Sequence, residues 1–95
     1  MTAYLIVRVN VTDPVQYEEY KKLTPGAIGA YGGKFIVRGG VAETLEGDEE
    51  DRRIVVVEFP DVESAKTCMA SPEYAEAKAK RIGAAEMQVV VVDGS

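Results

Sequence analysis

Four short apolar runs have the composition of β-strands, and segments with helical spacing separate the first run from the second and the third from the fourth. The strand-like runs occupy residues 3–11, 34–45, 52–60 and 86–94. Helical patterns occupy residues 12–31, 61–70 and 72–85, and an acidic hairpin loop at 46–51 joins the second run to the third. This β-α-β-β-α-β order predicts a single α+β domain over residues 1–95. We expect a ferredoxin-like fold, in which helices cover one face of a four-stranded antiparallel sheet.

The first helix has a well-marked beginning and an irregular second half. Asp13 can cap it, and Pro14 suits its first turn. The apolar spacing then continues to Tyr31 through Pro25, where we expect a kink or a restart. Paired glycines at 32–33 end the helix, and a second pair at 39–40 predicts a bulge or bend within the second strand.

Alternation along the strands divides the predicted sheet into two faces. The face under the helices is apolar and takes Leu5, Val7, Val9, Phe35, Val37, Val55, Val57 and Phe59. The other face is mixed, and its apolar members are Tyr4, Ile6, Ile36, Ile54, Val56, Val90 and Val92. Because half of this face is too apolar for water, we expect a second copy of the chain to pack on it as a two-fold homodimer.

Charge and residue usage exclude several classes of function. A net charge of −5 leaves no basic face for nucleic acid or anionic lipid, and no apolar run approaches the roughly 18 residues of a membrane span. The chain has no histidine, which excludes His-based triads and His-ligated metals. Cys68 is the only cysteine, so we expect an inert buried thiol and a cytoplasmic protein. The sequence predicts neither a metal nor a nucleotide cofactor.

Several longer motifs carry a family resemblance. They are "YGGKFIVRGG" at 31–40, "LEGD" at 45–48, "IVVVEFP" at 54–60, "SPEYAEAK" at 71–78 and "VVVVDG" at 89–94. Together they resemble family 1330 of the domains of unknown function, within the dimeric α/β-barrel superfamily. The resemblance implies a small bacterial, cytoplasmic homodimer in which two ferredoxin-like halves close a barrel. It implies no reaction, because the family has no established biochemical role.

Polar residues on the mixed face form the candidate site. Alternation places Arg8, Asn10, Arg38 and Glu58 there, and the fold makes the first and third strands neighbours, with the second strand beside the third. We therefore expect Arg8, Glu58 and Arg38 to lie side by side. Two arginines against one carboxylate leave a positive charge suited to a small carboxylate ligand. A second hypothesis places Tyr31, with Tyr17 and Tyr20, in a pocket between the first helix and the sheet.

Two functions remain open from the sequence. The first is a homodimer that binds or transforms a small anionic metabolite inside the barrel. The second is a non-catalytic dimerisation module whose Arg–Glu cluster is purely structural, because ion-pair networks often mimic functional sites. The tyrosines likewise have the helical spacing of ordinary core residues. A cavity of a few hundred Å³ in the dimer that touches Arg38 favours the first function, and a barrel closed by side chains favours the second.

Overall fold

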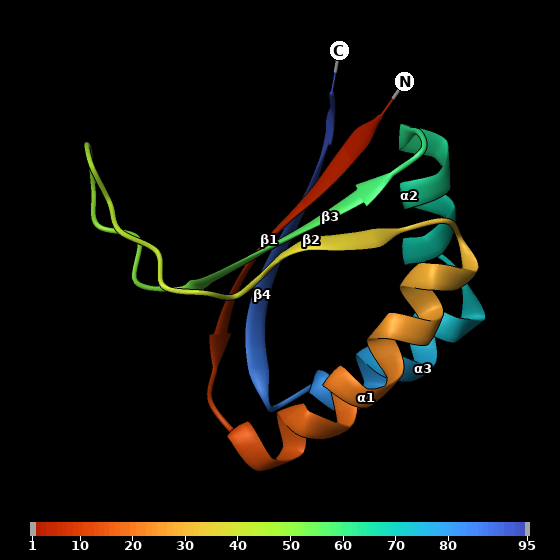
Figure 1. The fold of residues 1–95 in the computed structure, drawn as a ribbon. Helices are drawn as coiled ribbons and strands as arrows, with labels where there is room; N and C mark the ends of the chain where they lie inside the picture. The colour runs from red at the N-terminus through yellow and green to blue at the C-terminus, as the bar shows by residue number, and fades with distance from the viewer. Residues whose placement is uncertain (1, 95) are drawn as a thin grey trace.

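The computed structural model describes residues 2–94, which form seven elements in the predicted order (Figure 1). These are β1 (Ala3–Val11), α1 (Pro14–Ala30), β2 (Lys34–Arg38), β3 (Arg53–Phe59), α2 (Val62–Met69), α3 (Pro72–Arg81) and β4 (Ala85–Asp93). The strands make one antiparallel sheet in the order β2-β3-β1-β4. All three helices lie against the same face of the sheet. The predicted ferredoxin-like fold is therefore confirmed.

Each helix begins at a side-chain cap that the sequence shows. The Asp13 carboxylate accepts a hydrogen bond from the backbone N–H of Gln16 at 3.1 Å, and Asp61 and Ser71 cap α2 and α3 in the same way. The expected restart at Pro25 is wrong, because α1 is a single helix in which burial of one face outweighs the one backbone hydrogen bond that proline removes. The segment after Arg81 is not helical, so α3 is shorter than predicted. None of the helices within residues 2–94 has both the length and the apolarity needed to cross a membrane.

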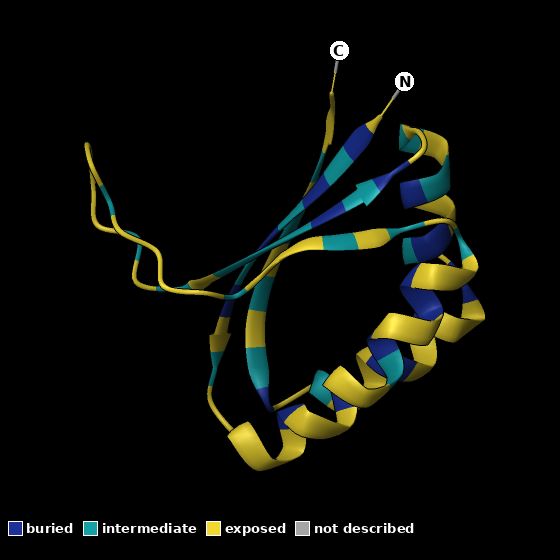
Figure 2. Cartoon of the chain, viewed as in Figure 1, coloured by how far each residue is buried: buried dark blue, intermediate teal, exposed yellow. Residues whose placement is uncertain are grey.

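The core fills the space between the helices and the sheet (Figure 2). Phe59 and Val57 of β3 are almost fully buried there. A close approach of the chain at Gly33 makes this packing possible, since a Cβ atom at that position would lie 2.8 Å from the ring of Phe59. Cys68 is also fully buried, and burial raises the pKa of its thiol, as expected for an unreactive cysteine.

A bulge in β2 reverses the faces of the residues that follow it. Phe35 lies opposite Val57, but Val37 lies opposite Val56 and Arg38 opposite Val55, so Ile36 is an extra residue on β2. Because Val55 faces the helices, Arg38 does so too, whereas Val37 faces away. The predicted positions of Arg38 and Val37 are therefore both wrong. The bulge also comes earlier than the glycine pair at 39–40, where it was expected.

After Arg38 the chain leaves the sheet as an irregular arm, residues 39–52, which projects well beyond it (Figure 1). The expected continuation of the strand to residue 45 is wrong: Gly39 takes a left-handed conformation (φ 83°), which ends the strand. The returning part of the arm is fixed by Glu50, whose carboxylate lies 2.9 Å from Arg8 Nε and 2.9 Å from Arg52 Nε. Two apolar side chains of the arm, Val41 and Leu45, are 105% and 90% exposed.

The open face, meaning the sheet face that the helices leave uncovered, carries an apolar row across all four strands. Val37, Val56, Ile6 and Val90 lie opposite one another in turn from β2 to β4. Val37 and Val90 are substantially exposed, as are Ile36 and Val92 beside them. Alternation predicted most of this face correctly, and the bulge adds Val37 to it.

Candidate functional site

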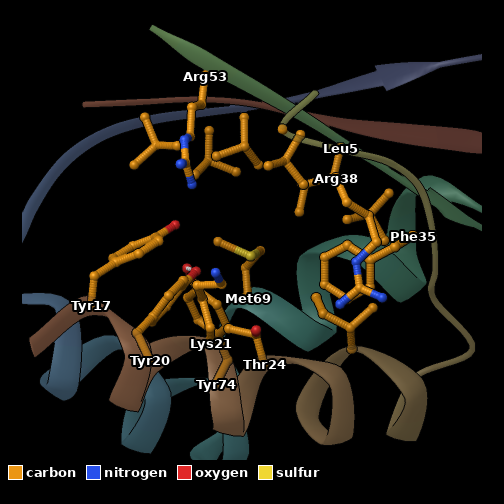
Figure 3. A pocket seen from close by; sticks show the side chains of 17 residues that line it. Leu5, Tyr17, Tyr20, Lys21, Thr24, Phe35, Arg38, Arg53, Met69 and Tyr74 are labelled. Carbon is orange, nitrogen blue, oxygen red and sulfur yellow. Dashed lines mark hydrogen bonds between the residues drawn. The ribbon is translucent and has the colours of Figure 1, made fainter. Parts of the chain in front are cut away.

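A pocket of about 130 Å³ lies between the helices and the sheet (Figure 3). Aliphatic side chains of the sheet, such as Val7 and Val57, form one wall, and Tyr17 and Tyr20 of α1 and Tyr74 of α3 form the other. An apolar cavity of roughly 150 Å³ in another protein holds benzene. The pocket therefore has room for a body of about one ring.

Three cationic side chains line this pocket, and no acidic side chain does. Arg53 extends from β3 into the space beside Tyr17, and the Arg38 guanidinium lies 4.7 Å from the centre of the Phe35 ring (Figure 3). Lys21 of α1 completes the set, with its Nζ 3.2 Å from Glu18 Oε1 in an exposed ion pair. In a chain with a net charge of −5, this absence of acids concentrates positive charge at the pocket.

Arg38 and Arg53 approach the pocket from neighbouring strands. Arg38 lies opposite Val55, and Arg53 comes two residues before Val55 on the same face, so the two arginines are diagonal neighbours. Neither forms an ion pair with any carboxylate of residues 2–94. Both are exposed, which places them at the rim of the pocket and leaves their N–H groups available to a ligand.

The tyrosines form the interior wall of the pocket. The Tyr20 and Tyr74 hydroxyl oxygens lie 3.0 Å apart, and the Tyr17 ring stacks on Tyr20 with 5.3 Å between ring centres. Burial, with the neighbouring Tyr74 hydroxyl, raises the pKa of Tyr20, and burial raises the pKa of Tyr17. The Tyr17 and Tyr20 hydroxyl groups therefore keep their protons at neutral pH and can donate hydrogen bonds.

Tyr31 does not line the pocket with Tyr17 and Tyr20. Its side chain lies elsewhere on the helix layer, where its hydroxyl donates to the Glu73 carboxylate at 3.1 and 3.2 Å. It follows the last residue of α1, whereas Tyr17 and Tyr20 belong to the buried face of that helix. The helical spacing of the tyrosines in the sequence therefore predicted the wrong location for Tyr31, because its side chain does not lie with Tyr17 and Tyr20.

The other residues of the predicted site lie on the open face but do not cluster. Arg8 faces Ile54 and pairs with Glu50, whereas Glu58 lies four residues further along β3, opposite Tyr4. Asn10 is exposed near the end of β1. With Arg38 on the opposite face of the sheet, the expected cluster of Arg8, Glu58 and Arg38 does not form, and Arg8 is instead part of an ion-pair cluster with Glu50 and Arg52.

Three residues of the pocket were missed by sequence reasoning. Alternation through Val55 and Val57 already places Arg53 on the helix side of the sheet, so its position was available from the sequence. Lys21 follows Tyr17 by one helical turn, and this spacing predicts the same face. Tyr74 had no comparable signal, because its place depends on how α3 packs against α1.

The pocket is suited to binding, and its chemistry is limited. None of its lining residues is a carboxylate, a cysteine or a histidine. Across residues 2–94, no group of such side chains is placed to hold a metal ion. The arrangement therefore offers cations, hydroxyl donors and apolar walls to a ligand.

The whole chain matches one family of proteins. The model of the family described as "Domain of unknown function (DUF1330)" matches residues 2–95. The chain belongs to this family. Membership in DUF1330 agrees with the resemblance of the sequence motifs and assigns no activity. No curated protein matches the chain in sequence.

Solved structures share the fold of this DUF1330 chain at low sequence identity. A protein of unknown function from Rhodopseudomonas palustris has a TM-score of 0.72 and 19% identity, covering 99% of this chain and 82% of its own. A dimeric ferredoxin-like protein of unknown function from Jannaschia has a TM-score of 0.72 and 15% identity, covering 98% of this chain and 99% of its own. SnoaB, a cofactor-independent oxygenase from Streptomyces nogalater, has a TM-score of 0.69 and 15% identity, covering 99% of this chain and 93% of its own. At these identities the likeness concerns the fold alone.

Proposed function

We propose that the protein binds a small organic anion in the pocket between the helices and the sheet. The observation that carries this proposal is the charge of the pocket: Arg38, Arg53 and Lys21 line it, and no acidic residue does. A guanidinium group presents paired N–H donors that match the two oxygens of a carboxylate. The ligand class is the one that the sequence indicated, but its site lies under the helices rather than on the open face.

The apolar walls indicate the rest of the ligand. The pocket is lined by the tyrosine rings and by the aliphatic side chains of Leu5, Val7 and Val57. A hydrocarbon or aromatic body of a ligand would be transferred from water into these apolar surroundings, which favours binding. With a volume of about 130 Å³, the pocket suits a body of about one ring with a carboxylate directed to the rim. A longer ligand would have to extend past Arg38 or Arg53 into solvent.

The proposal concerns binding and assigns no reaction to the pocket. SnoaB is described as a cofactor-independent oxygenase, but its likeness to this chain is one of fold. The lining residues include no carboxylate, cysteine or histidine that could serve as a base or nucleophile. The alternative, a purely structural module, retains an Arg–Glu cluster of different composition, in which Glu50 pairs with both Arg8 and Arg52.

The proposal includes a homodimer as the working unit. The apolar row of Val37, Val56, Ile6 and Val90 is bordered by both apolar and polar side chains, and the polar ones (Lys34, Glu58, Arg8 and Gln88) would contribute to the rim of an interface with an apolar core. The arm adds the exposed side chains of Val41 and Leu45, which a second copy could cover. A dimeric ferredoxin-like protein is among the proteins of similar structure. A standard interface buries roughly 1,600 Å² in total.

A comparison of benzoate with benzamide tests the proposed binding. The two molecules have nearly the same shape, but only benzoate carries a charge. We expect benzoate to bind at least about tenfold more tightly, because charge-assisted hydrogen bonds to arginine contribute roughly 1.5 kcal/mol or more. Isothermal titration at low ionic strength measures both affinities. Equal affinities for the two molecules, or no binding of benzoate at millimolar concentration, would contradict an anion site.

A further inference from the structure

Two buried hydroxyl groups on the interior wall of the pocket have more protons to donate than acceptors to receive them. Tyr20 and Tyr74 are 8% and 3% exposed, and both line the pocket. Their oxygens lie 3.0 Å apart, and the other polar neighbour of the pair is Met87, whose Sδ lies 3.9 Å from the Tyr20 oxygen. These contacts define the hydroxyl pair, Tyr20 and Tyr74.

A count of protons shows what the hydroxyl pair lacks. Each phenol has one proton to donate, and one of the two protons forms the hydrogen bond between the oxygens. Among residues 2–94, the other hydrogen-bond partner of the pair is the thioether sulfur of Met87, and sulfur is a weak acceptor. A buried donor without a good acceptor loses free energy that a ligand oxygen can restore. The hydroxyl pair therefore has one hydrogen bond to offer to an acceptor inside the pocket.

We propose that the hydroxyl pair recognises a hydrogen-bond acceptor at the end of the ligand remote from its carboxylate. This inference rests on the proposed function, which places the carboxylate near Arg38 and Arg53 at the rim. The hydroxyl pair comes from α1 and α3, on the wall opposite the strands that carry these arginines (Figure 3). The preferred ligand class is then a small acid with a second oxygen, such as a ring hydroxyl or an aldehyde, at its inner end.

Size-matched acids separate this inference from simple anion binding. Para-methylbenzoate and para-hydroxybenzoate have nearly the same shape, and para-formylbenzoate carries an oxygen that only accepts. The meta isomers of these acids are included because they place the second oxygen at a different position on the ring, from which it could also accept a hydrogen bond from the hydroxyl pair. We expect the best oxygen-bearing acid to bind about fivefold more tightly than its methyl counterpart, the effect of one neutral hydrogen bond. Isothermal titration measures the ratio.

Variants show whether the hydroxyl pair causes the preference. The double variant Tyr20→Phe/Tyr74→Phe removes both hydroxyls together, which leaves neither one unpaired and so is compatible with folding. We expect it to bind the methyl and oxygen-bearing acids equally. Tyr31→Phe is the control, because its hydroxyl lies outside the pocket and donates to Glu73, and it should keep the preference. Either single variant of the pair retains one free hydroxyl and should keep the preference at least in part.

The outcomes distinguish the two levels of the proposal. If para-methylbenzoate binds but no oxygen-bearing acid binds better to the wild type, this inference is wrong and the anion site stands. A preference that persists in the double variant also overturns it, because the hydroxyls are then not its source. If none of these acids binds, the proposed function fails together with the inference. If the double variant does not fold, a wild-type ratio near one still overturns the inference.

Discussion

Replacing Arg38 and Arg53 together by glutamine is expected to weaken benzoate binding by about a hundredfold. Each arginine can give a carboxylate a charge-assisted hydrogen bond worth roughly 1.5–3 kcal/mol. Because both side chains are exposed at the rim, where water and salt screen them, we take the lower end of this range for each. The sum of about 3 kcal/mol corresponds to the hundredfold change. Isothermal titration at low ionic strength measures it.

A matched double variant controls for the loss of charge. Lys22→Gln/Lys34→Gln also removes two positive charges, but neither lysine lines the pocket, and Lys34 lies opposite Glu58 on the open face. We expect this control to bind benzoate nearly as the wild type does. Neither Arg38 nor Arg53 has an ion-pair partner among residues 2–94, so their replacement should leave the melting temperature almost unchanged. An arginine double variant that binds benzoate as well as the control does would show that the pocket's charge has no role.

Replacing Ile6 by glutamate is expected to dissociate the proposed homodimer. Ile6 lies at the centre of the apolar row, between Val56 and Val90, on the open face. A carboxylate buried there without a partner would cost several kcal/mol, and the two-fold axis would bring the second copy's carboxylate near it. We expect the dimer dissociation constant to rise by at least about a hundredfold. Light scattering over a range of protein concentrations measures the change in mass.

Val15→Glu provides the control for this variant. Val15 is on α1, away from the open face, and is 82% exposed, so a glutamate there should leave the dimer intact. The monomer has a mass of 10.3 kDa. A wild-type protein that keeps this mass at every concentration would rule out the dimer, and so would an Ile6→Glu variant that associates as tightly as the wild type.

The order of the elements could be predicted from the sequence because it depends on local signals. Asp13, Asp61 and Ser71 cap their helices through side-chain contacts that span only a few residues. The alternation of Leu5, Val7 and Val9 in β1 likewise needs no knowledge of the neighbouring strands. These signals were sufficient for the fold class and for the apolar face of the central strands.

The position of Arg38 could not be predicted, because it depends on one extra residue in β2. The run from Phe35 to Val37 is apolar at every position, so nothing in its composition shows which residue is extra. Alternation without a bulge placed Arg38 on the open face, and the bulge at Ile36 turns it into the pocket. A one-residue change in register thus moved the candidate site from one face of the sheet to the other.

The separation of Arg8 from Glu58 has a different cause. Alternation indicates which face a side chain occupies, but not which residue of the next strand lies beside it. That pairing depends on the register of β1 against β3. The sequence does not specify this register, because the two strands are separated by α1, β2 and the arm rather than by a tight turn. Both side chains are on the predicted face, yet they lie four residues apart in register.

An amide NMR titration of the wild-type protein with benzoate tests the anion site most directly, because it reports both binding and position. Our account predicts saturable shifts at Arg38, Gly39 and Arg53 and along the part of α1 that carries Tyr17 and Tyr20, all of which line the pocket. The amide of Val92, which lies near the end of β4 and outside the pocket, should change little. Shifts confined to the open face, or no saturable shift at millimolar benzoate, would contradict the proposal that this pocket binds small organic anions.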